Sequence, residues 1–510
     1  MRNFILGLLA LCALLVTGQA RADSWIKAES AHFLIYSNAP EQKTRTYVRK
    51  LEAFRTLTNM LVGSHGTGPQ VKFQIYLLNS GDQMQIVRPS FAKGVGGVYF
   101  NCAEGTSAYS AIQYSKSDQD PSLLVLFHEY SHYVMFQTAK IAYPMWYAEG
   151  FAEYLSTAAP DKGQISIGEP AQGRMYVLGK DRWIDFARVL KPDFGFAGDR
   201  ANNPWEIQSF YAQSWLLTHY MMSDAHRAAA LNAYFVRVAA GEDPLTAWPA
   251  ATGMAIQDLH RILARYQTRM SYLKVAVADY PESAIAVSTV PATDSRIILD
   301  ASLLNTCLSS QQGQAVLARL QFEAPATGAT PLYQLALARA QLLFGDPAAA
   351  EAPLLAMVSA DADNFEARYL LGRVYTALAA KSAGKEAADL NDQAHSLYLA
   401  AYRLDAYNAP NLYYLSRTAG DPAQGANRNA VNAANNARLL APGVLDYAKY
   451  AAYTDLAIGN RDGAAEVLTP FLSDPHNQVQ AGRIQTAIVA IRDGKPMADV
   501  VRLLADVPAE

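Results

Sequence analysis

The segment LLVLFHEYSH, residues 123–132, carries the most specific pattern in this chain of 510 residues. An acidic residue and a proline just before it are typical of a helix start, and the apolar run predicts a helix through the segment. On a helix, residues four positions apart lie on the same face. His128 and His132 can therefore bind one Zn²⁺ together, and Glu129 is placed to take a proton from a metal-bound water. The alternative is two histidines that bind no metal.

A second segment, PMWYAEGFAEY at residues 144–154, offers a third ligand. A catalytic zinc needs three protein ligands and an open position. Glu149 follows His132 by 17 residues, which leaves room for a loop and a returning helix. Glu153 lies one turn further along the same face, so one glutamate can bind the metal while the other holds a ligand imidazole. The spacing leaves the choice between them open, and a solvated helix acid is the usual alternative for either.

Together, HEYSH and WYAEGFAEY resemble the gluzincin metallopeptidases, in particular their aminopeptidase N-like and peptidase MA-like branch, over about residues 24–275. In that branch the Glu of a W-x-x-E-G-x-A segment is the third zinc ligand. The resemblance therefore implies a zinc site of His128, His132 and Glu149, with Glu129 as general base and acid. It also implies an α+β fold, a thermolysin-like zincin domain with a mixed sheet and helices.

The resemblance implies two further parts of the site. The family stabilises the oxyanion with a Tyr downstream of the ligand Glu, and Tyr211 in SFYAQS lies 62 residues past Glu149. A phenol hydroxyl can donate to a developing oxyanion without changing its charge. The family also pairs the substrate backbone with an edge strand, for which residues 96–100 (GGVYF) are our candidate. This segment lacks the amine-recognising Glu of the family's G-x-M-E-N motif, which favours an endopeptidase over an aminopeptidase.

The first 22 residues, MRNFILGLLALCALLVTGQARA, predict a cleaved export signal. Arg2 precedes an apolar run from Phe4 to Val16, and an Ala-Arg-Ala cleavage site ends the segment. The run is short for a membrane anchor, and no later stretch is apolar enough to span a bilayer. We therefore expect a bacterial protein that is periplasmic or secreted, with no transmembrane segment after signal cleavage. The formal net charge of −3 shows no basic excess and argues against nucleic-acid binding.

Periodicity and composition divide the rest of the chain into four parts. Residues 23–115 predict the sheet part of a catalytic domain, and residues 116–280 its helical, zinc-binding part. Residues 281–330 are weakly patterned and are expected to form a linker. Residues 331–510 are rich in Ala, Leu and Tyr and repeat with a period of 34. This pattern resembles tetratricopeptide repeats and predicts an all-α solenoid with a surface for a protein partner. An Ala-rich helical domain without true repeats is the alternative.

Two cysteines remain after signal cleavage, Cys102 and Cys307. Export permits a disulfide between them. Their distance in sequence leaves open whether they pair or remain two buried thiols.

These patterns predict an exported zinc metallopeptidase that hydrolyses peptide or protein substrates by attack of a zinc-bound water, assisted by Glu129. The sequence contains no G-x-S-x-G, which argues against a serine hydrolase. Two alternatives remain. One is an envelope scaffold that binds partners through the repeats and keeps a vestigial zinc site, and the other is a metallohydrolase of non-peptide amides. Because Glu129 adds nothing to metal binding alone, its presence favours an enzyme over a scaffold.

Overall fold

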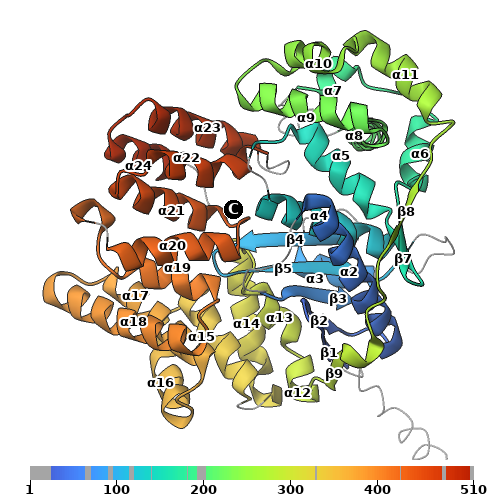
Figure 1. The fold of residues 1–510 in the computed structure, drawn as a ribbon. Coiled ribbons are helices and arrows are strands. Elements are labelled where there is room, and N and C mark those ends of the chain that lie inside the picture. The colour runs from blue at the N-terminus through green and yellow to red at the C-terminus, as the bar shows by residue number, and fades with distance from the viewer. Residues whose placement is uncertain are drawn as a thin grey trace, which may run out of the picture.

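The computed structural model describes residues 24–63, 71–89, 96–113, 120–138, 141–180, 182–191, 203–327, 330–425, 427–473 and 478–505. The expected export signal, residues 1–22, lies outside this range. Figure 1 shows a mixed half, coloured blue to green, beside an all-helical half, coloured yellow to red. The fold is α+β and mostly helical, with a small mixed sheet and a helical repeat-like portion. Within the described ranges, no helix combines the length and apolar character needed to cross a membrane.

Six strands form the main sheet in the order β4-β5-β3-β2-β1-β9. Strands β2, β3 and β5 run parallel, whereas β4 pairs antiparallel with β5 and forms one edge. The edge position of β4 agrees with the role expected for residues 96–100. The strands are β1 (Ile26–Glu29), β2 (Phe33–Ser37), β3 (Phe73–Leu78), β4 (Gly97–Cys102), β5 (Gly105–Ala111) and β9 (Ala286–Thr289).

Helices α2 (Glu41–Val62) and α4 (Pro121–Thr138) cover one face of this sheet. Alternate residues of β2, such as Phe33 and Ile35, point into a core shared with both helices. Phe54 of α2 and Phe127 of α4 stack there, with ring centroids 4.0 Å apart. The segment with the two histidines therefore forms the predicted helix and packs directly on the sheet. Helix α3 (Gly81–Val87) follows β3.

The other face of the sheet is covered by residues 281–330, which the sequence analysis assigns to a linker. Tyr76 and Tyr109 of the sheet pack against Ile297 and Leu304. The segment contributes edge strand β9 and the helices α12 (Ala292–Ser295), α13 (Ile298–Leu303) and α14 (Ser310–Thr327). It lacks one clear period because its apolar residues are divided among a short strand, the short helices α12 and α13, and the longer helix α14. The expected linker is thus a structural layer of the sheet domain.

The helical part of the first half lies between β5 and β9 in the sequence. Its helices are α5 (Met145–Ser156), α6 (Gln172–Leu178), α7 (Phe186–Val189), α8 (Pro204–Met222), α9 (Ala225–Ala239), α10 (Pro244–Thr252) and α11 (Leu259–Tyr266). It also contains a three-stranded sheet, β6-β7-β8, that the sequence analysis does not predict. Strands β6 (Ala159–Asp161), β7 (Gln164–Ile167) and β8 (Leu273–Ala276) are too short to give a clear alternation.

Consecutive helices pack side by side throughout the second half. They are α15 (Pro331–Phe344), α16 (Glu351–Ala360), α17 (Phe365–Ala379), α18 (Gly384–Leu404), α19 (Ala409–Arg417), α20 (Arg428–Leu440), α21 (Leu445–Ala457), α22 (Arg461–Leu468), α23 (Gln478–Arg492) and α24 (Met497–Ala505). Small residues allow close packing, since a Cβ on Gly372 would lie 2.7 Å from the ring of Tyr398. Ala394, Tyr398 and Ala401 are buried, as the repeat pattern predicts.

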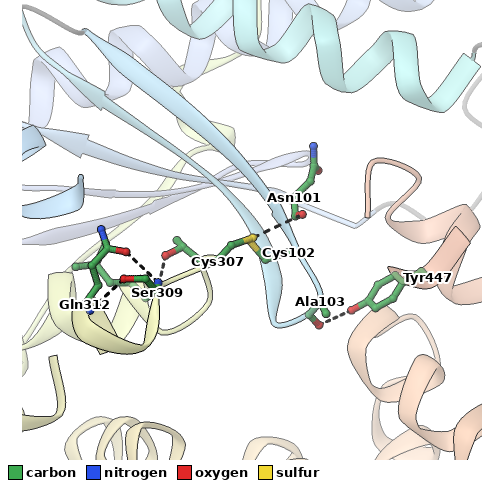
Figure 2. The surroundings of a disulfide bond; sticks show 9 residues. Asn101, Cys102, Ala103, Cys307, Ser309, Gln312 and Tyr447 are labelled. Atoms are coloured by element: carbon green, nitrogen blue, oxygen red, sulfur yellow. Dashed lines mark hydrogen bonds between the residues drawn. A yellow bond between two sulfur atoms is a disulfide. The ribbon is translucent and has the colours of Figure 1, made fainter. Parts of the chain in front are cut away.

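A disulfide joins the edge of the sheet to the layer that leads into the repeats. It links Cys102, the last residue of β4, to Cys307, which follows α13 (Figure 2). The pairing that the sequence leaves open is therefore present in the structure.

Candidate metal centre

Helix α4 carries both histidines of the H-E-x-x-H segment toward α5. Its start is set by Asp120, whose carboxylate accepts a hydrogen bond from the Ser122 backbone N–H at 3.1 Å. The same carboxylate accepts a hydrogen bond from the Tyr47 hydroxyl of α2 at 2.9 Å, which ties α4 to its neighbour. The Nε2 atoms of His128 and His132 lie 3.1 Å apart. The i, i+4 spacing thus brings the two imidazoles together as predicted.

Gly150 lets α5 and α8 pack in close contact. A Cβ at this position would lie 2.8 Å from the carbonyl carbon of Ser214, and closer still to the Ser214 oxygen and the Thr218 hydroxyl. A larger residue would push the two helices apart. The glycine of the W-x-x-E-G-x-A segment therefore sets the distance between the helix that carries Glu149 and the helix that carries Tyr211.

Three side-chain atoms converge where α4 and α5 meet. The Oε2 atom of Glu149 lies 3.4 Å from Nε2 of His128 and 3.6 Å from Nε2 of His132. A tetrahedral zinc with bonds of about 2.0–2.1 Å holds its ligand atoms about 3.3 Å apart. The side chain of Glu149 is fully buried, and His128 is only 15% exposed. Two imidazoles and a carboxylate therefore fit a zinc ion in both type and spacing.

Glu153 holds the far side of one imidazole. Its Oε1 atom lies 3.4 Å from Nδ1 of His128, the ring nitrogen that faces away from Glu149. Arg174 binds Glu153 through two contacts, at 2.9 Å from Nε and 2.5 Å from Nη2. This guanidinium offsets the burial of Glu153 and helps to lower the pKa of its carboxyl to about 2. The structure thus places Glu149 at the convergence point and Glu153 behind His128.

Charge coupling between α4 and α5 favours a bound proton when no metal is present. Burial lowers the pKa of His128, but the carboxylates of Glu149 and Glu153 outweigh burial and raise it well above its usual value. Burial likewise raises the pKa of Glu149, but the two imidazoles outweigh it and hold that pKa well below its usual value. A metal that binds here must therefore displace a proton.

Tyr211 and Glu129 lie at the same centre. The ring of Tyr211 is 6.4 Å from that of His128, and the Arg174 guanidinium lies 5.2 Å from the Tyr211 ring centroid. Burial and the nearby charges of Glu149 and Glu153 raise the pKa of Tyr211 well above its usual value, so its hydroxyl stays protonated. Glu129 is half-buried and close enough that its charge also raises the pKa of Tyr211. A hydrogen-bond donor and an acid thus accompany the three converging atoms.

Edge strand β4 runs beside the helix with the two histidines. A Cβ on Gly97 would lie 2.5 Å from Cγ1 of Val125, one turn before His128. Further along, the rings of Tyr99 and Tyr133 meet at 6.1 Å. The glycines of this segment thus allow close approach by α4.

Arg174 is a site residue that sequence reasoning missed. It lies in α6, 21 positions after Glu153, in a segment with no recognisable motif. One signal points to it indirectly. If one of two glutamates beside two histidines does not bind the metal, its buried charge needs a cation from elsewhere in the chain.

The chain matches no known protein-family model, and no curated protein matches it. Solved structures similar to it include that of a thermophilic TPR protein from Thermus thermophilus, at 18% sequence identity and a TM-score of 0.33. The match covers 39% of this chain and 99% of that chain. A likeness this distant carries no argument about function.

Proposed function

We propose that the chain is an exported zinc metallopeptidase with a thermolysin-like catalytic domain and a helical-repeat domain for docking. The convergence of His128 Nε2, His132 Nε2 and Glu149 Oε2 on one point carries the proposal. These are the three ligands that the gluzincin resemblance implies. The arrangement of α4 and α5 beside a mixed sheet is further support.

Each residue around the centre has a role in peptide hydrolysis. A zinc ion bound here would polarise the scissile carbonyl and lower the pKa of water to about 7. Glu129 accepts a proton from the attacking water and passes it to the leaving amine. Tyr211 donates its hydroxyl hydrogen to the developing oxyanion. Glu153, held by Arg174, orients His128 so that Nε2 faces Glu149 and His132.

An endopeptidase fits better than an aminopeptidase. Arg373 binds both carboxylate oxygens of Glu104, the acid at the tip of the β4–β5 hairpin, at 2.7 and 2.8 Å. Glu104 is therefore neutralised by the chain itself and does not offer a carboxylate to a free substrate amine. This supports cleavage within a chain rather than at its N-terminus.

The repeats provide a surface for a protein partner or substrate. A cavity of about 830 Å³ lies between the sheet and the repeats. Tyr36 and Lys72 line it from the sheet, and Tyr369, Tyr407 and Asp405 line it from the repeats. Aromatic faces interspersed with charges of both signs suit an extended polypeptide. We assign docking to this cavity.

Metal content and peptide cleavage test the proposal on the mature chain, residues 23–510. We expect about one zinc per wild-type chain by plasma mass spectrometry and a sharp loss in Glu149→Ala. Glu129→Gln should keep the zinc but lower cleavage of a broad peptide library by about 10³-fold. Glu206→Ala is the matched control, because Glu206 lies on α8 and pairs with Arg188. No zinc in folded, metal-supplemented wild type would contradict the proposal.

The rival function is an envelope scaffold with a vestigial zinc site. A zinc-loaded wild type that cleaves neither peptides nor other amides, yet binds a partner through the repeats, would favour that scaffold. Both functions share the proposed compartment, periplasmic or extracellular. The Cys102–Cys307 disulfide supports it, since structural disulfides persist mainly in oxidising environments.

A further inference from the structure

The tip of the β4–β5 hairpin contacts both the repeat domain and the layer that leads into it. Cys102 is bonded to Cys307 at the base of α14. The carbonyl of Ala103 accepts a hydrogen bond from the Tyr447 hydroxyl of α21 at 2.7 Å, and Figure 2 shows both connections at the end of the hairpin. Asn101 lies so close to Gly443 that a Cβ there would be 2.7 Å from its side chain. The segment just before α14 and the repeats thus both contact the tip of this hairpin.

A cluster of ion pairs makes a third contact with the hairpin tip. Glu104 accepts two hydrogen bonds from Arg373 of α17 and lies 3.6 Å from Arg339 of α15. Arg373 also stacks on the ring of Tyr414, 3.9 Å from its centroid. The side chains of both arginines are only 9% exposed. Removing one partner of such a cluster leaves an uncompensated buried charge, so these contacts fix the hairpin tip firmly.

Strand β4 runs from these contacts at the hairpin tip to the metal centre. Cys102 and Asn101 end the strand whose other end, Gly97, packs against Val125 of α4. Val125 lies three residues before His128. Because β4 is only six residues long and is paired with β5 along its length, a shift at its tip would move the whole strand relative to α4.

The outer edge of β4 is where an extended peptide can pair. The Ala111 N–H donates to the Gly96 carbonyl at 2.8 Å, and residues of an antiparallel pair alternately face toward and away from their partner. By this alternation Gly97, Tyr99 and Asn101 turn their backbone groups outward. The carbonyl of Asn101 agrees, since it lies 4.0 Å from the Cys307 sulfur. The outward groups of Gly97 lie where the strand passes α4.

We propose that Glu104, Arg373 and the Cys102–Cys307 disulfide are positioning residues, through which the repeat domain and the layer that leads into it hold β4 where a substrate backbone can pair beside the metal centre. The inference rests on the proposed metallopeptidase function and assigns the repeats a role within that site. The repeats then serve substrate binding directly, and separating them from the hairpin impairs recognition of a peptide more than metal binding.

Two hydroxamates separate these effects in the mature chain, residues 23–510. Acetohydroxamate binds a zinc ion alone, whereas a tetrapeptide hydroxamate also offers a backbone to β4. In Glu104→Gln and in Cys102→Ser/Cys307→Ser, we expect affinity for the tetrapeptide hydroxamate to fall about tenfold or more. Affinity for acetohydroxamate and zinc content should change by less than about twofold, because the ligands themselves are untouched.

Arg319→Gln is the matched control, since it removes an ion pair with Asp300, between α14 and α13, outside the hairpin. It should leave both affinities unchanged. Unchanged tetrapeptide affinity in the folded variants would overturn the inference, as would an equal loss of both hydroxamates with zinc retained. If Glu104→Gln does not fold, the double serine variant carries the test. A zinc-free wild type that binds neither compound would instead overturn the metallopeptidase proposal and, with it, this inference.

Discussion

Glu149 is a fully buried carboxylate and Glu104 a mostly buried one, with 16% of its side chain exposed, yet their surroundings differ in kind. Glu104 meets guanidinium groups, with Arg373 on both oxygens and Arg339 at 3.6 Å. Glu149 meets imidazole nitrogens at 3.4 and 3.6 Å. A guanidinium remains charged and completes its ion cluster, whereas an imidazole can release its proton to water and bind a metal through the freed nitrogen. The partner of such a carboxylate therefore separates a closed ion cluster from a set of potential metal ligands.

The charges of the two clusters differ as well. Near the hairpin, Glu104 and Glu366 are matched by Arg339 and Arg373. Around the histidines, three acids accompany Arg174, namely Glu129, Glu149 and Glu153. With His128 neutral, these described groups carry a net charge of −2, from three acids and one arginine, and a proton on His128 offsets part of it when no metal is present. The acids near the hairpin are thus balanced by arginines, whereas Arg174 balances only one of the three acids near the histidines.

The largest expected effect is on the neutral cluster. Arg373→Leu should lower the free energy of unfolding by about 3–5 kcal/mol, because Glu104 remains buried without its main partner. The double variant Glu104→Leu/Arg373→Leu should lose less, since it leaves no such charge. Urea denaturation of the three proteins measures the difference. Equal losses in the single and double variants would mean that burial, and not charge, stabilises this cluster.

A smaller effect is expected behind the metal centre. Arg174→Gln removes the cation that holds Glu153 against His128, so zinc affinity should fall about 10–100-fold without a change in the ligands. Competition with a chromophoric chelator measures that affinity. Arg188→Gln is the control, because Arg188 pairs with Glu206 away from the centre. If Arg174→Gln binds zinc with wild-type affinity, Arg174 does not support metal binding through Glu153.

The smallest effect concerns pH, which should act on the two clusters in opposite directions. Burial raises the pKa of Glu104 but Arg373 outweighs it, so the pKa is lowered. The contribution of the Glu104 carboxylate to the free energy of unfolding is complete above the usual pKa of 4.5. It is lost as pH falls through the lowered pKa. His128 has a raised pKa, so in the metal-free chain its contribution is complete below 6.5 and is lost as pH rises through the raised value.

Unfolding of the metal-stripped chain at several pH values checks this contrast. The advantage of wild type over His128→Leu should shrink by up to about 1.4 kcal/mol per pH unit above pH 6.5. Glu104 should add no slope in that range, since its carboxyl is ionised throughout. A pH-independent difference between wild type and His128→Leu would show that the imidazole carries no extra proton.

Structural features set by neighbouring residues could be predicted from the sequence, whereas contacts between distant segments could not. The i, i+4 spacing of His128 and His132 determines a shared helix face, so their convergence follows from helix geometry alone. Spacing could not choose between Glu149 and Glu153, and only the family resemblance favoured Glu149. The roles of His128, His132 and Glu149 as zinc ligands stay a prediction, although the structure brings these three residues together. Arg174 was missed because its contact with Glu153 of α5 depends on how α6 packs against α8.

The sheet edges show the same limit. Residues 96–100 were placed on an edge strand, but nothing in that segment indicates that its tip ends in the repeats. Residues 281–330 looked like a linker because a short strand and short helices give no sustained period. Two cysteines 205 residues apart likewise carry no local sign that they pair. Each of these features depends on how distant segments pack together.

The Cys102–Cys307 bridge also gives the chain an unusual topology. It joins residues 205 positions apart, and α4, α5 and α8 all lie inside the loop that it closes. A single proteolytic cut anywhere in that loop leaves two fragments joined through sulfur. Nicked protein would therefore run as one species on a non-reducing gel and separate only after reduction. The helices that carry His128, His132, Glu149 and Tyr211 therefore stay covalently joined after such a cut.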